Sequence, residues 1–160
     1  MKLWDYTIDL EFHGFTGKQI EKRIALFRDA TNFFASSLFR KLPKISVDIS
    51  LSTLKDVSGW CIPHEHSYYS IEISKKKCLY EQIITLAHEM VHCKQFYNGE
   101  LHERNGVIFW KRVPYYDAQD ENTPWEIEAY TKEQVLVENF INSDYNTVIL
   151  EKELAIQNVT

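Results

Sequence analysis

Residues 86–96 read Leu-Ala-His-Glu-Met-Val-His-Cys-Lys-Gln-Phe, and they contain the run His88-Glu89-Met90-Val91-His92. Positions four apart on a helix lie on one face, one turn from each other. His88 and His92 can therefore bind one zinc ion from the same side. Glu89 projects from nearly the same face and can take a proton from a water that the metal activates. The run predicts half of a zinc site together with a general base.

The segment around this run has the pattern of a buried helix. Asn98-Gly99 follows it, a pair typical of helix C-terminal ends. A chance match on a solvated helix would carry charges around both histidines. The apolar surroundings therefore favour a metal site over two ordinary histidines beside an ordinary glutamate. Apolar residues recur at helical spacing, at Tyr80, Ile83, Ile84, Ala87, Met90 and Val91.

Length and composition indicate one globular domain. The chain has 160 residues, of which 44% are hydrophobic, enough for a real core. We expect a single domain over residues 1–160, with its core over about 1–142 and a tail over 143–160. The net charge of −5 argues against a protein that holds nucleic acid through phosphate contacts. The basic residues near the first helix are expected to form a solvated helix face: Lys18, Lys22, Arg23, Arg28, Arg40, Lys41 and Lys44.

Cysteine usage and the N-terminal pattern predict a cytoplasmic location. The three cysteines, Cys61, Cys78 and Cys93, form an odd count without a C-x-x-C pair, which favours a reducing compartment without a disulfide framework. Residues 1–12 alternate between polar and apolar types and do not resemble a signal peptide. No apolar run approaches the roughly 20 residues that span a bilayer.

Periodicity predicts an α+β fold. Alternating patterns indicate strands over residues 4–12, 45–52 and 69–73. Helices are expected from about 16 to 39, around the histidine run, and from 123 to about 141. The first of these helices has a candidate capping box in Thr16 and Gln19. Residues 53–67 and 100–123 are expected to be loops, and the tail over 147–160 is left open between strand and helix. This order predicts helices packed on a small sheet.

A third zinc ligand must come from outside the histidine run, because a catalytic zinc usually takes three protein ligands. Helical phase favours Glu126, which shares a face with Ala129 and Tyr130, both expected to be buried. Glu128 lies on a face expected to be solvated and is the second candidate. His102 is a further candidate, although a surface position is favoured for it.

One alternative use of Glu126 stays open. Thr123 and Glu126 fit a capping box with Pro124 at the first helical position, and a glutamate used in that way would not bind zinc. His64 and His66 are not a helical pair and are interpreted as surface residues. Cys93 follows His92 directly, so it should point about 100° away around the helix and miss the metal.

The histidine run with a later glutamate on a second helix resembles the gluzincin arrangement of the zincin metallopeptidases. Residues 126–129, Glu-Ile-Glu-Ala, resemble the E-x-x-A element of small gluzincins and of ImmA/IrrE-like peptidases, and SprT-like proteins share the layout. The resemblance covers about residues 68–140. It implies that His88, His92 and Glu126 bind Zn²⁺ and that Glu89 is the catalytic base.

The resemblance carries three further expectations. The strand from Tyr69 to Ser74 would be the edge strand that pairs with a peptide substrate. Tyr130 stands where larger gluzincins carry an acid that orients a zinc-bound histidine, so the partner of that histidine differs here. Small single-domain members of this kind are common in phages and mobile elements, which suggests a phage-like origin.

The expected function is zinc-dependent hydrolysis of peptide bonds in a peptide or protein substrate. Tyr115, Tyr116 and His102 are candidates to stabilise the oxyanion, with aromatic packing favoured for each. Residues 100–123 would either wall a substrate groove or cover the core. One alternative is a zinc-stabilised binding or regulatory protein without turnover, which the presence of Glu89 disfavours. The other is a SprT-like DNA-associated protease, which the acidic charge disfavours.

Overall fold

The computed structural model describes residues 8–41, 43–116 and 121–143. Its central element is a four-stranded sheet in the order β1-β2-β4-β3. The first three strands of that order run parallel, and β3 runs antiparallel to β4. The sheet therefore has β1 at one edge and β3 at the other. The strands are β1 (Asp9–His13), β2 (Ser46–Ser52), β3 (Gly59–His64) and β4 (Tyr68–Ser74), with a short 3-10 turn, η1 (Glu65–Ser67), between the last two.

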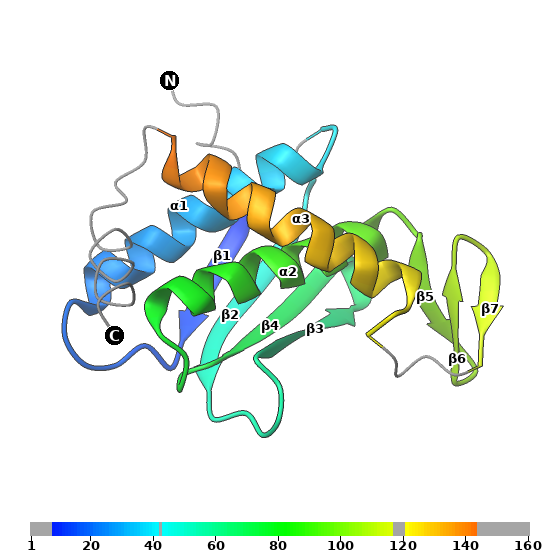
Figure 1. The fold of residues 1–160 in the computed structure, drawn as a ribbon, viewed down its shortest axis with the longest axis horizontal. Helices are drawn as coiled ribbons and strands as arrows, with labels where there is room; N and C mark the ends of the chain where they lie inside the picture. The colour runs from blue at the N-terminus through cyan, green and yellow to red at the C-terminus, as the bar shows by residue number, and fades with distance from the viewer. Residues whose placement is uncertain (1–7, 42, 117–120, 144–160) are drawn as a thin grey trace.

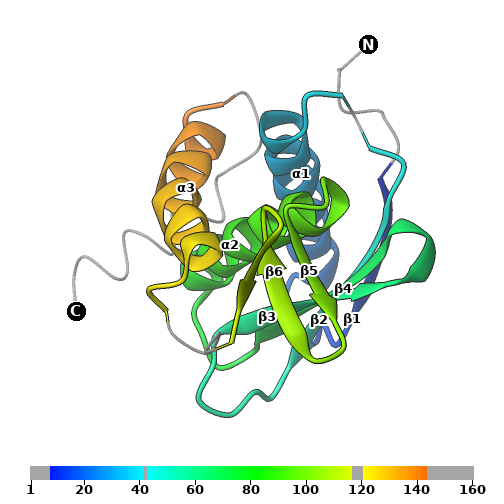
Figure 2. The same ribbon diagram turned by 90° about the vertical axis from the view of Figure 1, so that its right-hand side faces the viewer.

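Three helices lie on one face of this sheet (Figure 1). The middle one, α2, contacts β3 and β4 and is flanked by the other two. A second, three-stranded antiparallel sheet projects beyond the C-terminal end of α2 and faces the viewer in Figure 2. The described residues thus form the mixed α+β fold that the sequence predicts. These elements are α1 (Ile20–Leu38), α2 (Leu79–Tyr97), α3 (Pro124–Ile141), β5 (Leu101–Arg104), β6 (Val107–Trp110) and β7 (Val113–Tyr115).

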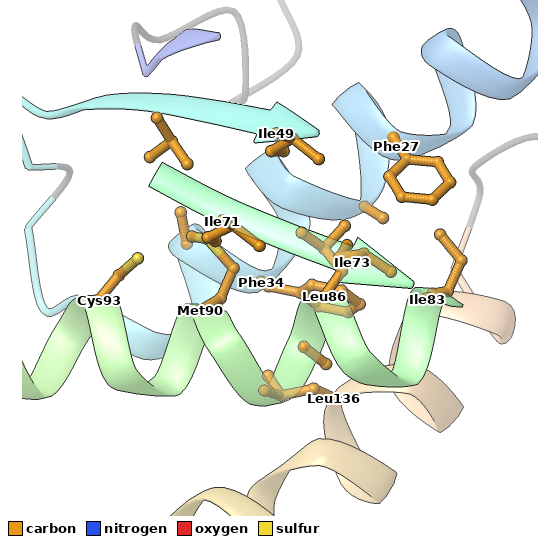
Figure 3. Packing of buried hydrophobic residues seen from close by; sticks show 14 of the residues in the cluster. Phe27, Phe34, Ile49, Ile71, Ile73, Ile83, Leu86, Met90, Cys93 and Leu136 are labelled. Carbon is orange, nitrogen blue, oxygen red and sulfur yellow. The ribbon is translucent and has the colours of Figure 1, made fainter. Parts of the chain in front are cut away.

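The core fills the space between the main sheet and the helices (Figure 3). Alternating residues of β2 and β4 point into it, as the period of two requires. From Gln82 to Cys93, α2 is buried at every position except Ile84. Polar side chains on this stretch must therefore find partners inside the protein. The fully buried core includes Phe27, Phe34, Val47, Ile49, Ile71, Ile73, Leu86 and Met90.

The start of the first helix differs from the prediction. α1 begins at Ile20, and the residue before it, Gln19, has φ 59° and makes no side-chain capping bond. Gly17 also lies in the left-handed region, at φ 87°. Two left-handed residues interrupt the helix before Ile20, so the capping box of Thr16 and Gln19 is wrong. The carbonyl of Thr16 instead accepts a hydrogen bond from Arg23 at 2.7 Å.

Both segments expected to be loops contain strands. Residues 53–67 include β3, whose Gly59 and Pro63 weakened the strand pattern, although an edge strand tolerates proline. Residues 100–123 include β5, β6 and β7. Asn105-Gly106 joins β5 to β6 with φ 54° and 78°, the positive angles of a two-residue hairpin turn. Asn-Gly is the typical sequence signal of such a turn.

β4 is not an edge strand, because it lies between β2 and β3. The expectation that residues Tyr69 to Ser74 offer a free edge is therefore wrong, and β3 occupies the edge instead. The predicted strand over 4–12 is described only from residue 8, and the tail over 147–160 lies outside the described residues. No helix in the described part of the chain has the length and apolar character needed to cross a membrane.

Candidate metal centre

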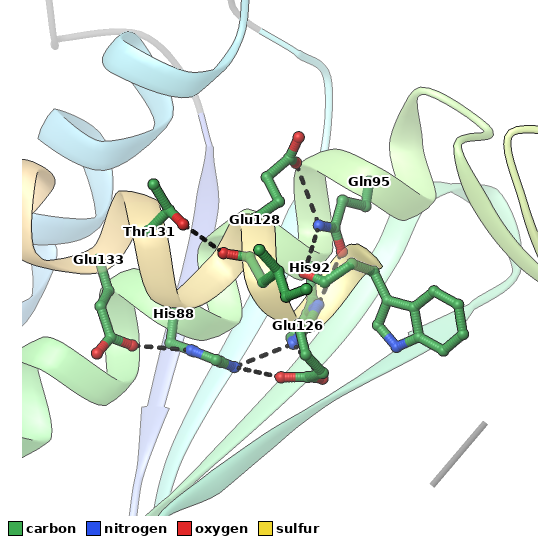
Figure 4. Close-up of polar contacts among 9 residues, drawn as sticks. His88, His92, Gln95, Glu126, Glu128, Thr131 and Glu133 are labelled. Atoms are coloured by element: carbon green, nitrogen blue, oxygen red, sulfur yellow. Dashed lines mark hydrogen bonds and ion pairs between the residues drawn. The ribbon is translucent and has the colours of Figure 1, made fainter. Parts of the chain in front are cut away.

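Two helices bring the predicted ligands together at one point (Figure 4). α2 supplies His88 and His92 one turn apart, and their Nε2 atoms lie 3.2 Å from each other. α3 supplies Glu126, whose two oxygens lie 3.1 Å from the Nε2 atoms of His88 and His92. One ligand atom from each residue falls within 4.8 Å of the others. The geometry is that of a group that could hold one metal ion.

A carboxylate sets the tautomer of His88. Its Nδ1 lies 2.8 Å from Oε2 of Glu133, one further turn along α3 from Tyr130. An ionised carboxylate only accepts hydrogen bonds, so Nδ1 of His88 carries the proton and donates it. The Nε2 atom then presents its lone pair toward Glu126.

An amide sets the tautomer of His92. The Nε2 group of Gln95 donates to the carbonyl of Trp125 at 3.0 Å and to Oε1 of Glu128 at 3.1 Å. Its Oε1 is therefore the acceptor that lies 2.8 Å from Nδ1 of His92. That nitrogen must carry the proton, so Nε2 of His92 also presents a lone pair to the cluster.

With both histidines neutral, these bonds make the cluster a set of three acceptors without a donor of its own. Two imidazole lone pairs and the carboxylate of Glu126 converge within hydrogen-bond distance. Such a set is repulsive unless a cation lies among its members. In the metal-free protein a proton on Nε2 of His88, whose pKa is raised to about 9, can fill that role, and a metal ion could take its place. Two histidines and one glutamate are also a ligand set of catalytic zinc sites. The residues therefore fit a divalent metal, and other divalent ions could take the same ligands.

The pKa values of His88 and Glu126 are shifted in the directions expected for a site that attracts positive charge. Burial alone would lower the pKa of His88, but its hydrogen bonds to Glu126 and Glu133 outweigh burial and raise it to about 9. Burial alone would raise the pKa of Glu126, but hydrogen bonds from His88 and His92 lower it to about 2. The carboxylate is thus ionised at any ordinary pH.

Glu89 lies on α2 beside the cluster and is only 5% exposed. Its burial raises its pKa to about 7, against the opposing charges of His92 and His88. A carboxyl with a pKa near neutral can both accept and release a proton. β3 approaches closely here, because a Cβ on Gly59 would lie 3.5 Å from Oε1 of Glu89 and 2.6 Å from Cγ2 of Thr85. Glycine at position 59 is required by this contact.

A cavity of about 1080 Å³ opens over the cluster. Its floor is the α2 face that carries His88, Glu89 and His92. Its walls come from β3, from the β5–β6 hairpin and from the first turns of α3. The predicted loop over 100–123 therefore walls the cavity, and it also covers a small second core formed by Leu101, Trp110 and Trp125. Wall residues include Cys61, Ile62, Phe96, His102, Ile108 and Tyr130.

The capping alternative for Glu126 is wrong. Thr123 does stand at the N-cap of α3, but no side-chain capping bond forms there. The carboxylate of Glu126 contacts the two histidines instead. Glu128 is not on a solvated face as expected, because it accepts hydrogen bonds from Gln95 and from Lys94 at 3.2 Å. It lies behind the cluster and does not join it.

The other predicted candidates stay outside the cluster. His102 is exposed and stacks on Phe109 with ring centroids 5.1 Å apart, and it reaches the cavity wall only. Tyr115 packs edge-on against Trp125. Tyr116 was expected to pack against other aromatic residues, but it is 86% exposed.

Surface positions were predicted correctly for two histidines and wrongly for one tyrosine. His64 and His66 are exposed, as expected. Tyr130 was expected to be buried but is 51% exposed. Its ring packs against His88 with centroids 4.7 Å apart, so it borders the cluster from the solvent side.

Sequence reasoning missed the two residues that orient the histidines. Glu133 lies seven positions after Glu126, two helical turns along the same face of α3, so periodicity could have identified it. Gln95 lies three positions after His92 on α2, a spacing at which side chains meet.

Cys93 points from α2 toward the sheet (Figure 3), and it does not belong to the group of possible ligands, as its helical phase predicts. Its Sγ lies 3.3 Å from Sγ of Cys61 on β3. The hydrogen bond with Cys93 and burial raise the pKa of Cys61 well above its usual value.

A second group of possible ligand atoms lies on the opposite edge of the main sheet. Glu11 and His13 come from β1 and Asp48 from β2, and their atoms also fall within 4.8 Å. The side chain of His13 is 54% exposed and that of Glu11 is 72% exposed. Water competes for these atoms, so the group is a weak candidate for holding a metal.

Comparisons with protein-family models, with curated proteins and with solved structures gave no match. What the site does is therefore inferred from the residues of this chain.

Proposed function

We propose that the protein is a zinc-dependent metallopeptidase that hydrolyses peptide bonds. The observation that carries the proposal is the convergence of two imidazole lone pairs and one carboxylate, beside a buried Glu89, at the floor of a cavity. His88, His92 and Glu126 would hold the metal. A structural zinc site would instead close its fourth position with a further protein ligand.

In the proposed hydrolysis, the metal and the side chain of Glu89 have different roles. A zinc ion held by these residues supplies Lewis-acid polarisation of water and of the scissile carbonyl. Glu89 accepts the proton of the attacking water and delivers it to the leaving amine. Its burial supports this role, because a pKa raised to about 7 lets the same carboxyl serve as base and then as acid.

Glu133 and Gln95 act as positioning residues in this proposal. Each accepts the Nδ1–H of one histidine, which fixes the ring orientation and leaves Nε2 free. Partners of this kind typically change metal affinity or activity by 10–100-fold. Glu128 acts through Gln95 and not on a histidine directly, because it accepts a hydrogen bond from the Gln95 amide and so holds that amide in the required orientation.

The substrate is expected to bind as an extended peptide along β3. Among the described strands, β3 pairs with β4 alone, so its other edge can add a strand. β3 also forms a wall of the cavity, so a peptide paired with it would lie over Glu89 and the histidines. This role replaces the one expected for β4.

Tyr130 is the side chain best placed to stabilise the oxyanion. It lies in the cavity wall with its ring against His88. Burial and the nearby carboxylate of Glu126 raise its pKa, so the phenol stays protonated and can donate a hydrogen bond. Tyr130→Phe should lower turnover by about 10²-fold without changing zinc content, as loss of an oxyanion donor does.

The test combines metal content with turnover. Wild-type protein loaded with zinc is incubated with a mixed-sequence peptide library, and products are read by mass spectrometry. Glu89→Gln should keep its zinc and lower cleavage by at least about 10²-fold. Cleavage at the wild-type rate by Glu89→Gln would remove Glu89 from the base role. A zinc-loaded wild type that cleaves no peptide would contradict the peptidase proposal.

A further inference from the structure

Two cysteines from elements distant in the sequence meet behind the cavity wall that β3 forms. Cys61 lies in the middle of β3, and Cys93 lies on α2 directly after His92. Their sulfur atoms are 3.3 Å apart. A disulfide bond is about 2 Å long, so an approach of only about 1 Å separates this contact from a covalent link.

The contact between the two cysteines repeats, one step further along, a contact that β3 and α2 already make. Gly59 abuts Glu89, and two residues further along β3 Cys61 abuts Cys93, one turn further along α2. Positions two apart on a strand and four apart on a helix share a face. The two cysteines therefore join β3 to α2 one step beyond the contact of Gly59 with Glu89.

The two thiols differ in access. Cys61 is partly exposed and lines the cavity, so a small reagent can reach it. Cys93 is fully buried in the core. This asymmetry defines which sulfur reacts first and which resolves the product.

We propose that Cys61 and Cys93 are a modification site at which a hydroperoxide forms a reversible disulfide between β3 and α2. Sγ of Cys61 attacks the peroxide, the O–O bond breaks, and the products are Cys61 sulfenic acid and an alcohol or water. Sγ of Cys93 then attacks the sulfenic sulfur, the S–O bond breaks and water leaves. The two thiols lose two electrons in total, and these reduce one peroxide. The raised pKa of Cys61 makes this reaction slow.

The disulfide would clamp the wall of the cavity to its floor. β3 is an edge strand held by pairing with β4 on one side only, among the described strands. A covalent link to α2 removes its freedom to move away from the helix. The inference needs only the fold and the two thiols, so it stands independently of the proposed peptidase activity.

Cys78 provides the matched control. It precedes α2 at its N-terminal end, fifteen positions before Cys93. That separation is about 22 Å along the helix, too far for a link to the same partner.

The experiment treats the reduced protein with hydrogen peroxide, blocks the remaining thiols and maps peptides without reduction. We expect a Cys61–Cys93 linked peptide in the wild type and in Cys78→Ser, and none in Cys61→Ser. In Cys93→Ser, Cys61 should accumulate as a sulfenic acid that dimedone traps. The linked protein should melt roughly 5–10 °C higher, and dithiothreitol should reverse the shift.

Three results would overturn the inference. One is that both thiols of folded protein stay reduced, or oxidise separately, without forming a link. Another is that Cys78 is linked as often as either partner. The third is that a link forms only after urea unfolds the chain. None of these results bears on zinc binding or on peptide cleavage, so the two proposals fail separately.

Discussion

The molecule contains two groups of histidine and carboxylate atoms with similar spacing and different surroundings. One group is His88, His92 and Glu126 between α2 and α3, and the other is Glu11, His13 and Asp48 on the main sheet. In the first, neighbouring side chains fix both imidazole tautomers, and the histidines are 8–9% exposed. In the second, the side chains of His13 and Glu11 are 54% and 72% exposed, and His13 lies 3.5 Å from Glu11 and 4.0 Å from Asp48.

The comparison teaches that proximity alone does not make a metal site. Screening by water lowers the attraction that an exposed group exerts on a cation. Enclosure strengthens it, and the bonds of Glu133 and Gln95 turn the Nε2 atoms of His88 and His92 toward Glu126. The buried group should therefore bind metal tightly and the exposed one weakly.

The largest expected effect separates the two groups directly. His92→Ala removes one of three ligands and should weaken zinc binding by about 10²–10⁴-fold, since ligands share the large binding free energy of such sites. His13→Ala is the matched control and should leave the tight site unchanged. Competition with a fluorescent chelator measures both affinities. If both variants lost zinc affinity equally, the two groups would not differ as metal sites.

The next effect concerns the orienting bonds. Glu133→Gln replaces a charged acceptor of the His88 proton by a neutral amide, and it should weaken zinc binding by about 10–100-fold. Gln134→Ala, at an exposed neighbouring position on α3, is the control and should bind zinc normally. If Glu133→Gln bound zinc as tightly as the wild type, burial of the site would determine its affinity, and the orientation of the His88 ring would not.

Dependence on pH sharpens the comparison further. The pKa of His88 is raised from 6.5 to about 9. In metal-free protein, its proton therefore contributes stability that is complete below pH 6.5 and is lost as the pH rises toward 9. Zinc displaces that proton, so its apparent affinity rises over the same interval. The increase in melting temperature caused by zinc should grow from pH 6.5 to 9, as differential scanning calorimetry can measure. A shift that is constant across this range would contradict the raised pKa.

The smallest effect tests the wall of the buried site. Gly59→Ala places a Cβ 2.6 Å from Cγ2 of Thr85 and 2.7 Å from the carbonyl of Glu72. Relieving this overlap should lower the free energy of unfolding by about 1–3 kcal/mol. Thr85→Ser removes the methyl group involved, so the double variant should regain part of the loss. Urea denaturation measures each value, and a Gly59→Ala protein as stable as the wild type would show that β3 does not abut α2.

Local patterns predicted the elements that carry the site. The helical period predicted the helix that carries His88 and His92. The phase argument favoured Glu126 over Glu128, although of the two residues expected to be buried beside it only Ala129 is buried and Tyr130 is 51% exposed. Strongly periodic segments are read reliably because burial dictates their spacing. The helix start near Thr16 failed because left-handed residues intervened, which the capping pattern does not encode.

Features that depend on contacts between distant segments were missed. β3 becomes a strand by pairing with β4, although its glycine and proline weaken the local pattern. The bond between Gln95 and Trp125 and the contact between Cys61 and Cys93 join residues 30 and 32 positions apart. A single sequence contains no signal for such pairs, because nothing in either segment specifies its partner.

The most direct test is a crystal structure of zinc-soaked protein with anomalous data collected at the zinc edge. The account predicts one strong peak per chain, in contact with Nε2 of His88, Nε2 of His92 and the carboxylate of Glu126. A peak at Glu11, His13 and Asp48 with none between α2 and α3 would contradict the central claim.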